Sequence, residues 1–214
     1  MKAVVISDLH LGSRHSMAGR FVAFLRSLPP ETALVLNGDT VDALGRQMPP
    51  EHTQALDAIR DESVKRRVIW ILGNHDGKFR LEDAPEIEYA HDWSVPGRLY
   101  VSHGAEFLPF RRFLKATVYV LLPLRVRLLG DPILTVRTIK KVRLFFSILN
   151  WGMMRKAASH AARNGFPCIV CGHMHMPADT MVNGVRYINT GTWTEWPAHY
   201  VLVDDSSVSL CSTT

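Results

Sequence analysis

Residues 2–10, KAVVISDLH, place a run of mostly apolar, β-branched side chains directly before an Asp-x-His pair. The same order, an apolar run followed by polar residues, recurs in ALVLNGD (33–39), VIWILGNHD (68–76), LYVSHG (99–104) and CIVCGHMH (168–175). Runs that are apolar on both faces are typical of strands covered by other layers. Because ligand sites in α/β folds gather where such strands end, we expect five loops to converge on one point.

The residues that follow these strands carry carboxylate, amide and imidazole groups and no thiolate, which is the donor set that a pair of divalent metal ions needs. We assign one ion to Asp8, His10, Asp39 and His175. We assign the second to Asp39, Asn74, His103 and His173. Asp39 is the expected bridge, because one carboxylate can give an oxygen to each of two metals about 3.5–4 Å apart.

Spacing within these stretches suggests how the side chains reach the ions. Asp8 and His10, like His173 and His175, lie two residues apart, and such residues point the same way if the chain is extended. His75 is left outside the ligand set. A histidine beside a ligand can stabilise a phosphoryl oxygen or protonate a leaving group, and Asp76 is placed to orient its ring. We therefore expect His75 and Asp76 to be catalytic.

Each piece alone is weak, since a single Asp-x-His or Gly-Asp is usually a loop pair or a turn. Together, the motifs DLH, GDTVD, GNHD, SHG and GHMH, spanning residues 8–175, resemble those of the calcineurin-like metallophosphoesterase superfamily. The resemblance implies a four-layer α/β/β/α sandwich, two metal ions, and in-line attack on phosphorus by a metal-bound hydroxide. It also implies that Asp42 supports the site rather than binding metal.

Composition agrees with this fold class. The chain has 214 residues and 47% hydrophobic content, which suits one domain spanning residues 1–214. The absence of a basic leader with an apolar core predicts a cytoplasmic location. Cys168 and Cys171 form a C-x-x-C, but residues three apart in a strand face opposite sides, so we expect two small buried hydrophobes rather than a redox or zinc site.

Other segments predict the scaffold. Helical spacing appears over residues 17–28 and 54–64, and residues 180–189 form a hairpin around Asn183-Gly184. Residues 200–210 give another strand pair around Asp204-Asp205, and we expect both pairs in the second sheet. Core packing is favoured for Trp193, Glu195 and Trp196, and substrate contact is the alternative.

Residues 107–156 do not fit a minimal phosphatase. This segment holds eleven basic residues and one acid, a balance of +10, and since the whole chain is +5 the remainder carries −5. Its two uncharged apolar runs, 116–124 and 144–154, are shorter than the roughly 20 residues that span a bilayer. Such a mixture favours a lid that forms an acyl-chain groove or a membrane-facing surface. The alternative is a helical cap with solvated charges.

The lid sequence resembles the helical insertion of the UDP-2,3-diacylglucosamine hydrolases of lipid A biosynthesis. That resemblance implies a lipid-linked nucleotide substrate cleaved to UMP and acylated glucosamine 1-phosphate. It also implies Mn²⁺ as the usual ion, with Fe²⁺, Zn²⁺ or Co²⁺ as alternatives, and a peripheral place on an anionic inner membrane face. Candidate substrate-binding residues are Arg80, Arg111, Lys115, Val120, Leu121 and Leu124.

Two residues depart from the pattern of those hydrolases and leave an alternative function open. His75 stands where those hydrolases often have arginine, and Ala105 stands where an aspartate commonly follows the His-Gly. The core therefore also suits a phosphodiesterase or phosphatase acting on another lipid phosphate, a cyclic nucleotide or nucleic acid. Nucleic acid is disfavoured because aromatic residues are sparse among the lid arginines. A non-catalytic scaffold would require damaged ligands, and none is missing.

Overall fold

A computed structural model describes residues 2–42, 48–109 and 143–213, with side chains from residue 147 in the last range. Its first sheet has the strand order β11-β10-β1-β2-β3-β4. The strands are β1 (Ala3–Ile6), β2 (Ala33–Asn37), β3 (Val68–Ile71), β4 (Glu88–Ala90), β10 (His199–Val203) and β11 (Val208–Ser212). Strands β1 to β4 pair in parallel, whereas β10 and β11 are antiparallel. The carboxyl ends of β1, β2 and β3 therefore lie at the same edge.

The second sheet has the order β5-β6-β7-β9-β8. Its strands are β5 (Asp92–Val95), β6 (Leu99–Ser102), β7 (Cys168–Cys171), β8 (Ala178–Val182) and β9 (Val185–Asn189). Strands β6, β7 and β9 are parallel, so their ends also share one edge. The described helices are α1 (Ala18–Ser27), α2 (Pro50–Ser63), α5 (Arg143–Arg163) and the short 3-10 helix η1 (Ala105–Phe107).

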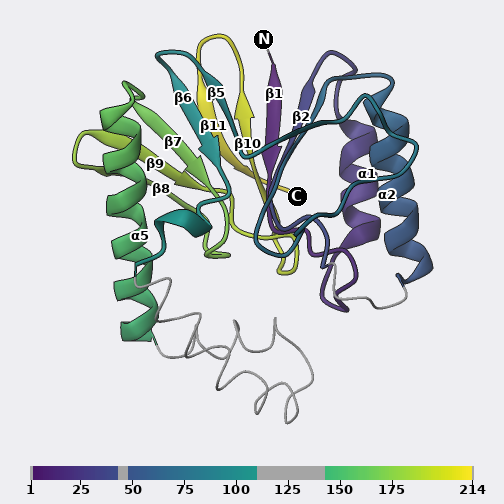
Figure 1. Cartoon of the computed structure of the whole chain (residues 1–214), viewed down its shortest axis with the longest axis horizontal. Helices are drawn as coiled ribbons and strands as arrows, with labels where there is room; N and C mark the ends of the chain where they lie inside the picture. Colours follow the sequence, from purple (N-terminus) through teal and green to yellow (C-terminus); the bar gives the residue numbers. More distant parts are fainter. Residues whose placement is uncertain (1, 43–47, 110–142, 214) are drawn as a thin grey trace.

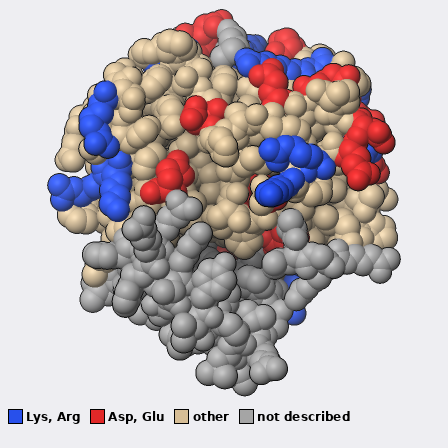
Figure 2. Space-filling model, viewed as in Figure 1, with Lys and Arg blue, Asp and Glu red and all other residues tan. Residues whose placement is uncertain are grey.

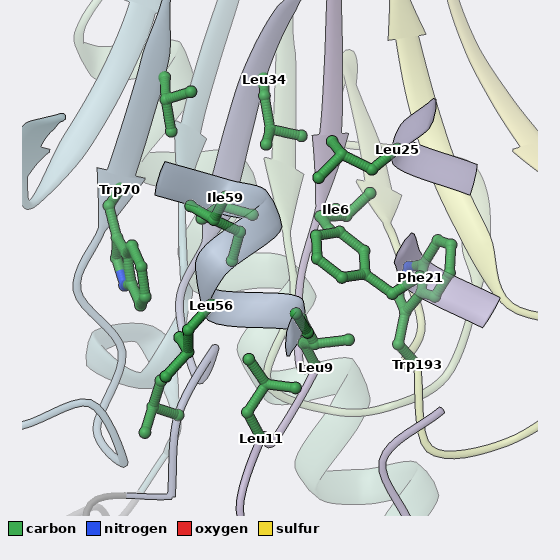
Figure 3. Close-up of a cluster of buried hydrophobic side chains, with 14 of the residues drawn as sticks. Ile6, Leu9, Leu11, Phe21, Leu25, Leu34, Leu56, Ile59, Trp70 and Trp193 are labelled. Carbon is green, nitrogen blue, oxygen red and sulfur yellow. The ribbon is translucent and has the colours of Figure 1, made fainter. Parts of the chain in front are cut away.

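Helices α1 and α2 lie on one side of the two sheets and α5 on the other (Figure 1). Successive side chains of a strand point to opposite faces of the sheet, and this alternation explains the layers. In β1, Val4 and Ile6 join the core under α1 and α2, whereas Ala3 and Val5 join the core between the sheets. Figure 3 shows Phe21 and Leu25 of α1 packing near Ile6. The predicted α/β/β/α sandwich is confirmed.

The third buried layer lies between the second sheet and α5. Met153, Ala157 and Ala161 of α5 pack there against Ile169 and Tyr187 of the second sheet. The C-x-x-C residues divide between layers as predicted, because Cys168 belongs to the core between the sheets and Cys171 to the core under α5. Both thiols are buried and free, so they act as small hydrophobic side chains.

Two local expectations change and one is confirmed. The β10–β11 pair lies in the first sheet rather than the second, because β10 pairs with β1. Helix α2 begins at Pro50 rather than residue 54, since proline is well suited to a first helical turn. The β8–β9 hairpin is confirmed, and both residues of its turn, Asn183 (φ 50°) and Gly184 (φ 81°), have the positive φ that a two-residue hairpin favours.

Most of the predicted lid, residues 110–142, lies outside the described residues, whereas Phe107 ends η1, residues 108 and 109 follow it, and residues 143–156 belong to α5. Across the described ranges, every helix is too short or too polar to cross a membrane.

Candidate metal centre

Loops that leave the carboxyl ends of β1, β2, β3, β6 and β7 carry the predicted ligands. The structure brings six of these side chains into two compact groups. One holds Asp8, His10 and His175, and the other holds Asp39, His103 and His173, with the ligand atoms of each group within 4.8 Å of one another. Asn74 adjoins the second group, where its Oδ1 lies 3.3 Å from Nε2 of His103. The structure therefore brings the seven predicted ligands close together, and their binding of metal stays a prediction.

In the first group, three atoms with lone pairs face one another. His175 Nε2 lies 3.1 Å from Asp8 Oδ1 and 3.1 Å from His10 Nε2. Asp8 Oδ1 is buried and lacks a hydrogen bond of regular geometry. A buried carboxylate oxygen without a hydrogen bond is costly unless a cation lies beside it. These residues therefore fit a divalent metal site.

The remaining atoms of these side chains are held by the protein. Asp8 Oδ2 accepts hydrogen bonds from Ser7 Oγ (2.5 Å) and from the backbone N–H of His173 (2.9 Å). His10 Nδ1 lies 2.8 Å from Asp42 Oδ1, which leaves its Nε2 facing the group. A carboxylate behind a ligating histidine fixes the ring and its tautomer. Asp42 thus contacts His10, but Asp42, His10 and His75 also form a group whose ligand atoms lie within 4.8 Å of one another. That Asp42 supports the site without binding metal stays a prediction.

The second group has the same construction. Nε2 of His103 lies 3.2 Å from Asp39 Oδ2, and its Nδ1 contacts the carbonyl oxygen of Asn37 at 3.0 Å. Asp39 Oδ1 accepts a hydrogen bond from the backbone N–H of His75 at 2.7 Å. Asp39 belongs to this group only, and the ligand atoms of the first group do not include it. Its expected bridging between two ions stays a prediction.

Backbone conformation shows how the loops aim these side chains. Among the described residues, seven non-glycine residues have positive φ, and five of the seven are expected ligands: Asp8 (55°), His10 (50°), Asp39 (52°), His173 (66°) and His175 (53°). The two-apart pairs are therefore not extended, and their side chains reach the groups from left-handed backbone instead. Left-handed backbone at non-glycine residues is costly and clusters at functional sites.

The close approach of the β7 loop to the β1 loop depends on a glycine at position 172. A Cβ atom at Gly172 would collide with the side chains of Ser7 and Asp8. The β7 loop can therefore approach the Asp8 carboxylate only without a side chain at residue 172.

Electrostatics favour the metal-binding forms of several groups. Burial favours the neutral Asp8 carboxyl, but the charge of His175, its hydrogen bond and the charge of His103 together outweigh burial and lower the Asp8 pKa to about 2. Burial opposes ionisation of Asp39 as well, yet nearby His103 holds its pKa well below the ordinary value. Burial and the charge of His103 lower the pKa of His173 to about 3. Two carboxylates and one neutral imidazole are ready to bind a cation, as metal ligands must be.

His75 is held by Asp42 rather than by Asp76. Its Nδ1 lies 2.8 Å from Asp42 Oδ1, the same oxygen that contacts His10. Burial alone would lower the His75 pKa, but the hydrogen bond to Asp42 and the charge of Asp39 raise it to about 9. One carboxylate thus links a ligand histidine to the expected proton donor, and sequence reasoning missed this contact although the GDTVD motif contains Asp42.

The expectation that Asp76 orients the His75 ring is corrected. The buried Asp76 carboxylate accepts four backbone hydrogen bonds of 2.7–2.9 Å, from the N–H groups of Gly73, Asp39, Thr40 and Val41. Asp76 therefore clasps the loop that carries Asp39 to the loop that carries Asn74. It shapes the metal centre through the backbone.

Besides Asp42 and Asp76, residues 192 and 193 also hold the site in place, and sequence reasoning did not identify them. The backbone oxygen of Asp8 accepts hydrogen bonds from Thr192 Oγ1 and from the N–H of Trp193, both at 3.0 Å. No spacing signal in the sequence connects residues so far apart. The Trp193 ring is fully buried against Phe21 and Phe24, so core packing is confirmed for it, whereas Trp196 is half exposed.

The expected substrate-binding residues are not at the metal groups where the structure describes them. Arg80 is exposed, its guanidinium lies over the Tyr89 ring, and it donates to the carbonyl oxygen of Phe79. The other five lie outside the described residues: Arg111, Lys115, Val120, Leu121 and Leu124.

Comparisons with known proteins agree with this geometry. A family model described as calcineurin-like phosphoesterase matches residues 1–177. A search of curated proteins found no match. Among solved structures, an archaeal phosphodiesterase is similar, with 14% identity, 100% coverage of both chains and a TM-score of 0.52.

A single mutant of Vps29 from Entamoeba histolytica is also similar, with a TM-score of 0.50 and 14% identity over 100% of this chain and 98% of that one. A protein of unknown function from Aquifex aeolicus is similar with a TM-score of 0.50 and 16% identity over 88% of both chains. Likeness at these identities shows the fold alone.

Proposed function

Because the chain belongs to the calcineurin-like phosphoesterase family, we propose that it is a dinuclear-metal hydrolase of UDP-2,3-diacylglucosamine, releasing UMP and acylated glucosamine 1-phosphate. The coarser activity, hydrolysis of a phosphoester with a divalent-metal site, follows from the family and from the Asp and His groups. The observation that carries the proposal is the buried Asp8 Oδ1, which faces two imidazole nitrogens and has no hydrogen bond of regular geometry.

Two divalent ions, with Mn²⁺ as the proposed metal, would be held by the two groups of residues. When bound, such ions supply charge neutralisation at phosphoryl oxygens and lower the pKa of water. Asp8, His10 and His175 hold one ion in this proposal, Asp39, Asn74, His103 and His173 hold the other, and Asp39 reaches both.

The protein's own residues supply proton transfer and positioning. His75 has a raised pKa of about 9 and is only partly exposed, so it can carry a proton to the oxygen that leaves phosphorus. Asp42 fixes the ring through Nδ1, which directs Nε2 away from the carboxylate. Asp76 holds the two loops on which Asp39 and His75 lie. Together they keep the proton donor and the metal ligands in one arrangement.

The lipid-bearing substrate is supported by the lid sequence and by the described start of α5. Ile148 and Trp151 on this helix are 55% and 58% exposed, although both are large apolar side chains. Exposed apolar residues next to a basic segment suit contact with an acyl chain or with an anionic membrane surface. A peripheral place on the inner face of the membrane is part of the proposal.

A substrate panel tests this function. Purified protein with Mn²⁺ is incubated with UDP-diacylglucosamine, bis-p-nitrophenyl phosphate, cyclic nucleotides and single-stranded nucleic acid, and the products are identified. The proposal expects the highest kcat/KM for UDP-diacylglucosamine, with UMP as a product. Preference for another diester or monoester would instead favour the alternative that His75 suggests, a metal-dependent phosphodiesterase or phosphatase.

A further inference from the structure

A second concave site lies between α5 and η1, away from the Asp and His groups. Its volume is 360 Å³, and it is lined by Phe107, Arg155, Lys156, Ser159, His160 and Arg163. Five of these residues lie along α5, where positions three, four and eight apart share one side of a helix. Figure 2 shows Lys and Arg atoms on the side of the molecule where α5 lies, and others over the top and the opposite side, where Asp and Glu atoms lie beside them.

The charged side chains that line this site are all positive. Helix α5 contains four Lys or Arg residues and neither Asp nor Glu. Within the described part of the chain, none of the three cations in the lining has a carboxylate partner: Arg155 lies over the Trp151 ring at 4.7 Å, and Arg163 Nε donates to the carbonyl oxygen of Ser159 at 3.3 Å. The contrast is with α2, where Arg60 pairs with Asp57 and Lys65, just beyond its end, pairs with Glu62. Among the described residues, the three cations of the lining, Arg155, Lys156 and Arg163, therefore remain available to an anion.

Aromatic rings pack around His160, which lines the site. The His160 ring packs between Phe107, at 5.3 Å, and Tyr100 of β6, at 5.0 Å. The N–H of Phe107 donates to the carbonyl oxygen of Gly104, the residue that follows His103. The site is thus fixed by the same turn that carries a metal ligand, while its own lining contains none of the seven ligands.

Two guanidinium groups, one ammonium, an imidazole and a hydroxyl around one hollow are the donors that tetrahedral oxyanions recognise. Arginine offers planar paired donors to phosphate oxygens, and lysine acts as a point charge. We propose that the hollow between α5 and η1 binds a phosphate group, separately from the metal centre. The phosphate could come from a soluble phosphate compound or from a phospholipid headgroup, because both present the same oxygens.

The test compares two reversals of the same charge on different helices. Lys156→Glu changes the proposed site, and Arg26→Glu makes the same charge reversal on the exposed surface of α1, outside that site. Binding of inorganic phosphate and pyrophosphate is measured by calorimetry on the metal-loaded chain. Because the metal centre is unchanged in both variants, its own affinity for phosphate cancels in the comparison.

A second arm uses vesicles of phosphatidylcholine with and without phosphatidic acid, measured by sedimentation. We expect Lys156→Glu to weaken binding of the soluble phosphates, of the phosphatidic acid vesicles, or of both by about tenfold or more. Arg26→Glu should bind each of them within about twofold of wild type. The probe whose binding is lost shows whether the phosphate group comes from a soluble compound or from a lipid headgroup. Ser159→Ala, which removes one hydroxyl donor without changing charge, should weaken the same probe by a smaller factor.

Failure of both probes to bind beyond the metal centre would overturn the phosphate site. Equal losses in Lys156→Glu and Arg26→Glu would overturn it as well, because they would show a response to net charge alone. Neither result bears on the proposed hydrolysis, which depends on the Asp and His groups. The two proposals can therefore fail independently.

Discussion

The apolar core that packs against the strands differs in kind from the loops at the carboxyl ends of those strands. In the core, Val4, Ile6, Leu34 and Leu36 are buried among apolar side chains on regular strands. Two residues after Ile6 and three after Leu36, Asp8 and Asp39 are equally buried, but they carry charge and left-handed backbone. Buried charge and strained backbone cost stability, whereas packed apolar side chains provide it. Substitutions in the two regions should therefore separate activity from stability.

The largest expected loss of activity is at Asp39. Asp39→Ala removes the oxygens facing His103 and the acceptor of the His75 N–H, so turnover should fall to background while the apolar core keeps the chain folded. Hydrolysis of bis-p-nitrophenyl phosphate, metal content and circular dichroism are measured together. Asp39→Asn is the matched control, because it keeps the shape and one oxygen but loses the charge. Wild-type turnover with full metal content in the Ala variant would contradict the role of Asp39.

His75→Ala should leave most metal bound and reduce kcat by roughly 10²–10⁴, the usual range for loss of a positioned proton donor. The physical basis is that His75 contacts Asp42 and lies outside the two ligand groups as we assign them. Metal analysis of the variant distinguishes the roles. If both ions are lost, His75 is a ligand and the assignment is wrong.

Asp76→Ala connects the two regions, because it leaves four backbone N–H groups without their buried acceptor. Each unsatisfied group costs about 1–3 kcal/mol, so we expect a loss of at least about 3 kcal/mol in unfolding free energy and about 10–100-fold in kcat. Denaturant unfolding and kinetics are measured on the same samples. Asp76→Asn, which retains one acceptor oxygen, should lose less of both. Reduced kcat with unchanged stability would instead restore the ring-orienting role for Asp76.

The smallest effect on activity is expected in the core. Leu25 is fully buried under the first sheet, and Leu25→Ala should lower the unfolding free energy by about 2–5 kcal/mol. kcat should stay within about twofold, since the loops of the metal centre do not contain this residue. Val64→Ala is the control, because Val64 is 67% exposed and should change stability by less than about 0.5 kcal/mol. A large fall in kcat for Leu25→Ala would show that the two regions are coupled.

Regular structure followed closely from the sequence. Runs such as LYVS and CIVC are short, β-branched and bounded by polar residues, and the structure has strands at Leu99–Ser102 and Cys168–Cys171 as expected. The polar residues after each run were also recognised, because donors of one chemical class followed five strands. Strands β4 and β5 were not predicted, since EYA and DWSV are brief and largely polar.

The sequence could not reveal how the loops are bent. Left-handed φ at His173 and His175 depends on tertiary contacts, such as the bond from the His173 N–H to Asp8. The role of Asp76 was misjudged for a similar reason, because adjacency to His75 in sequence says nothing about which N–H groups surround a carboxylate. Sheet membership of β10 and β11 required knowledge of the pairing with β1.

The most direct measurement is the number of ions per chain, determined by elemental analysis alongside phosphoester hydrolysis during chelation and readdition of Mn²⁺. The dinuclear centre predicts about two ions per chain at full activity. It also predicts loss of activity as the ions are removed and recovery when Mn²⁺ is restored. Full activity in metal-free protein, or at one ion per chain, would contradict it.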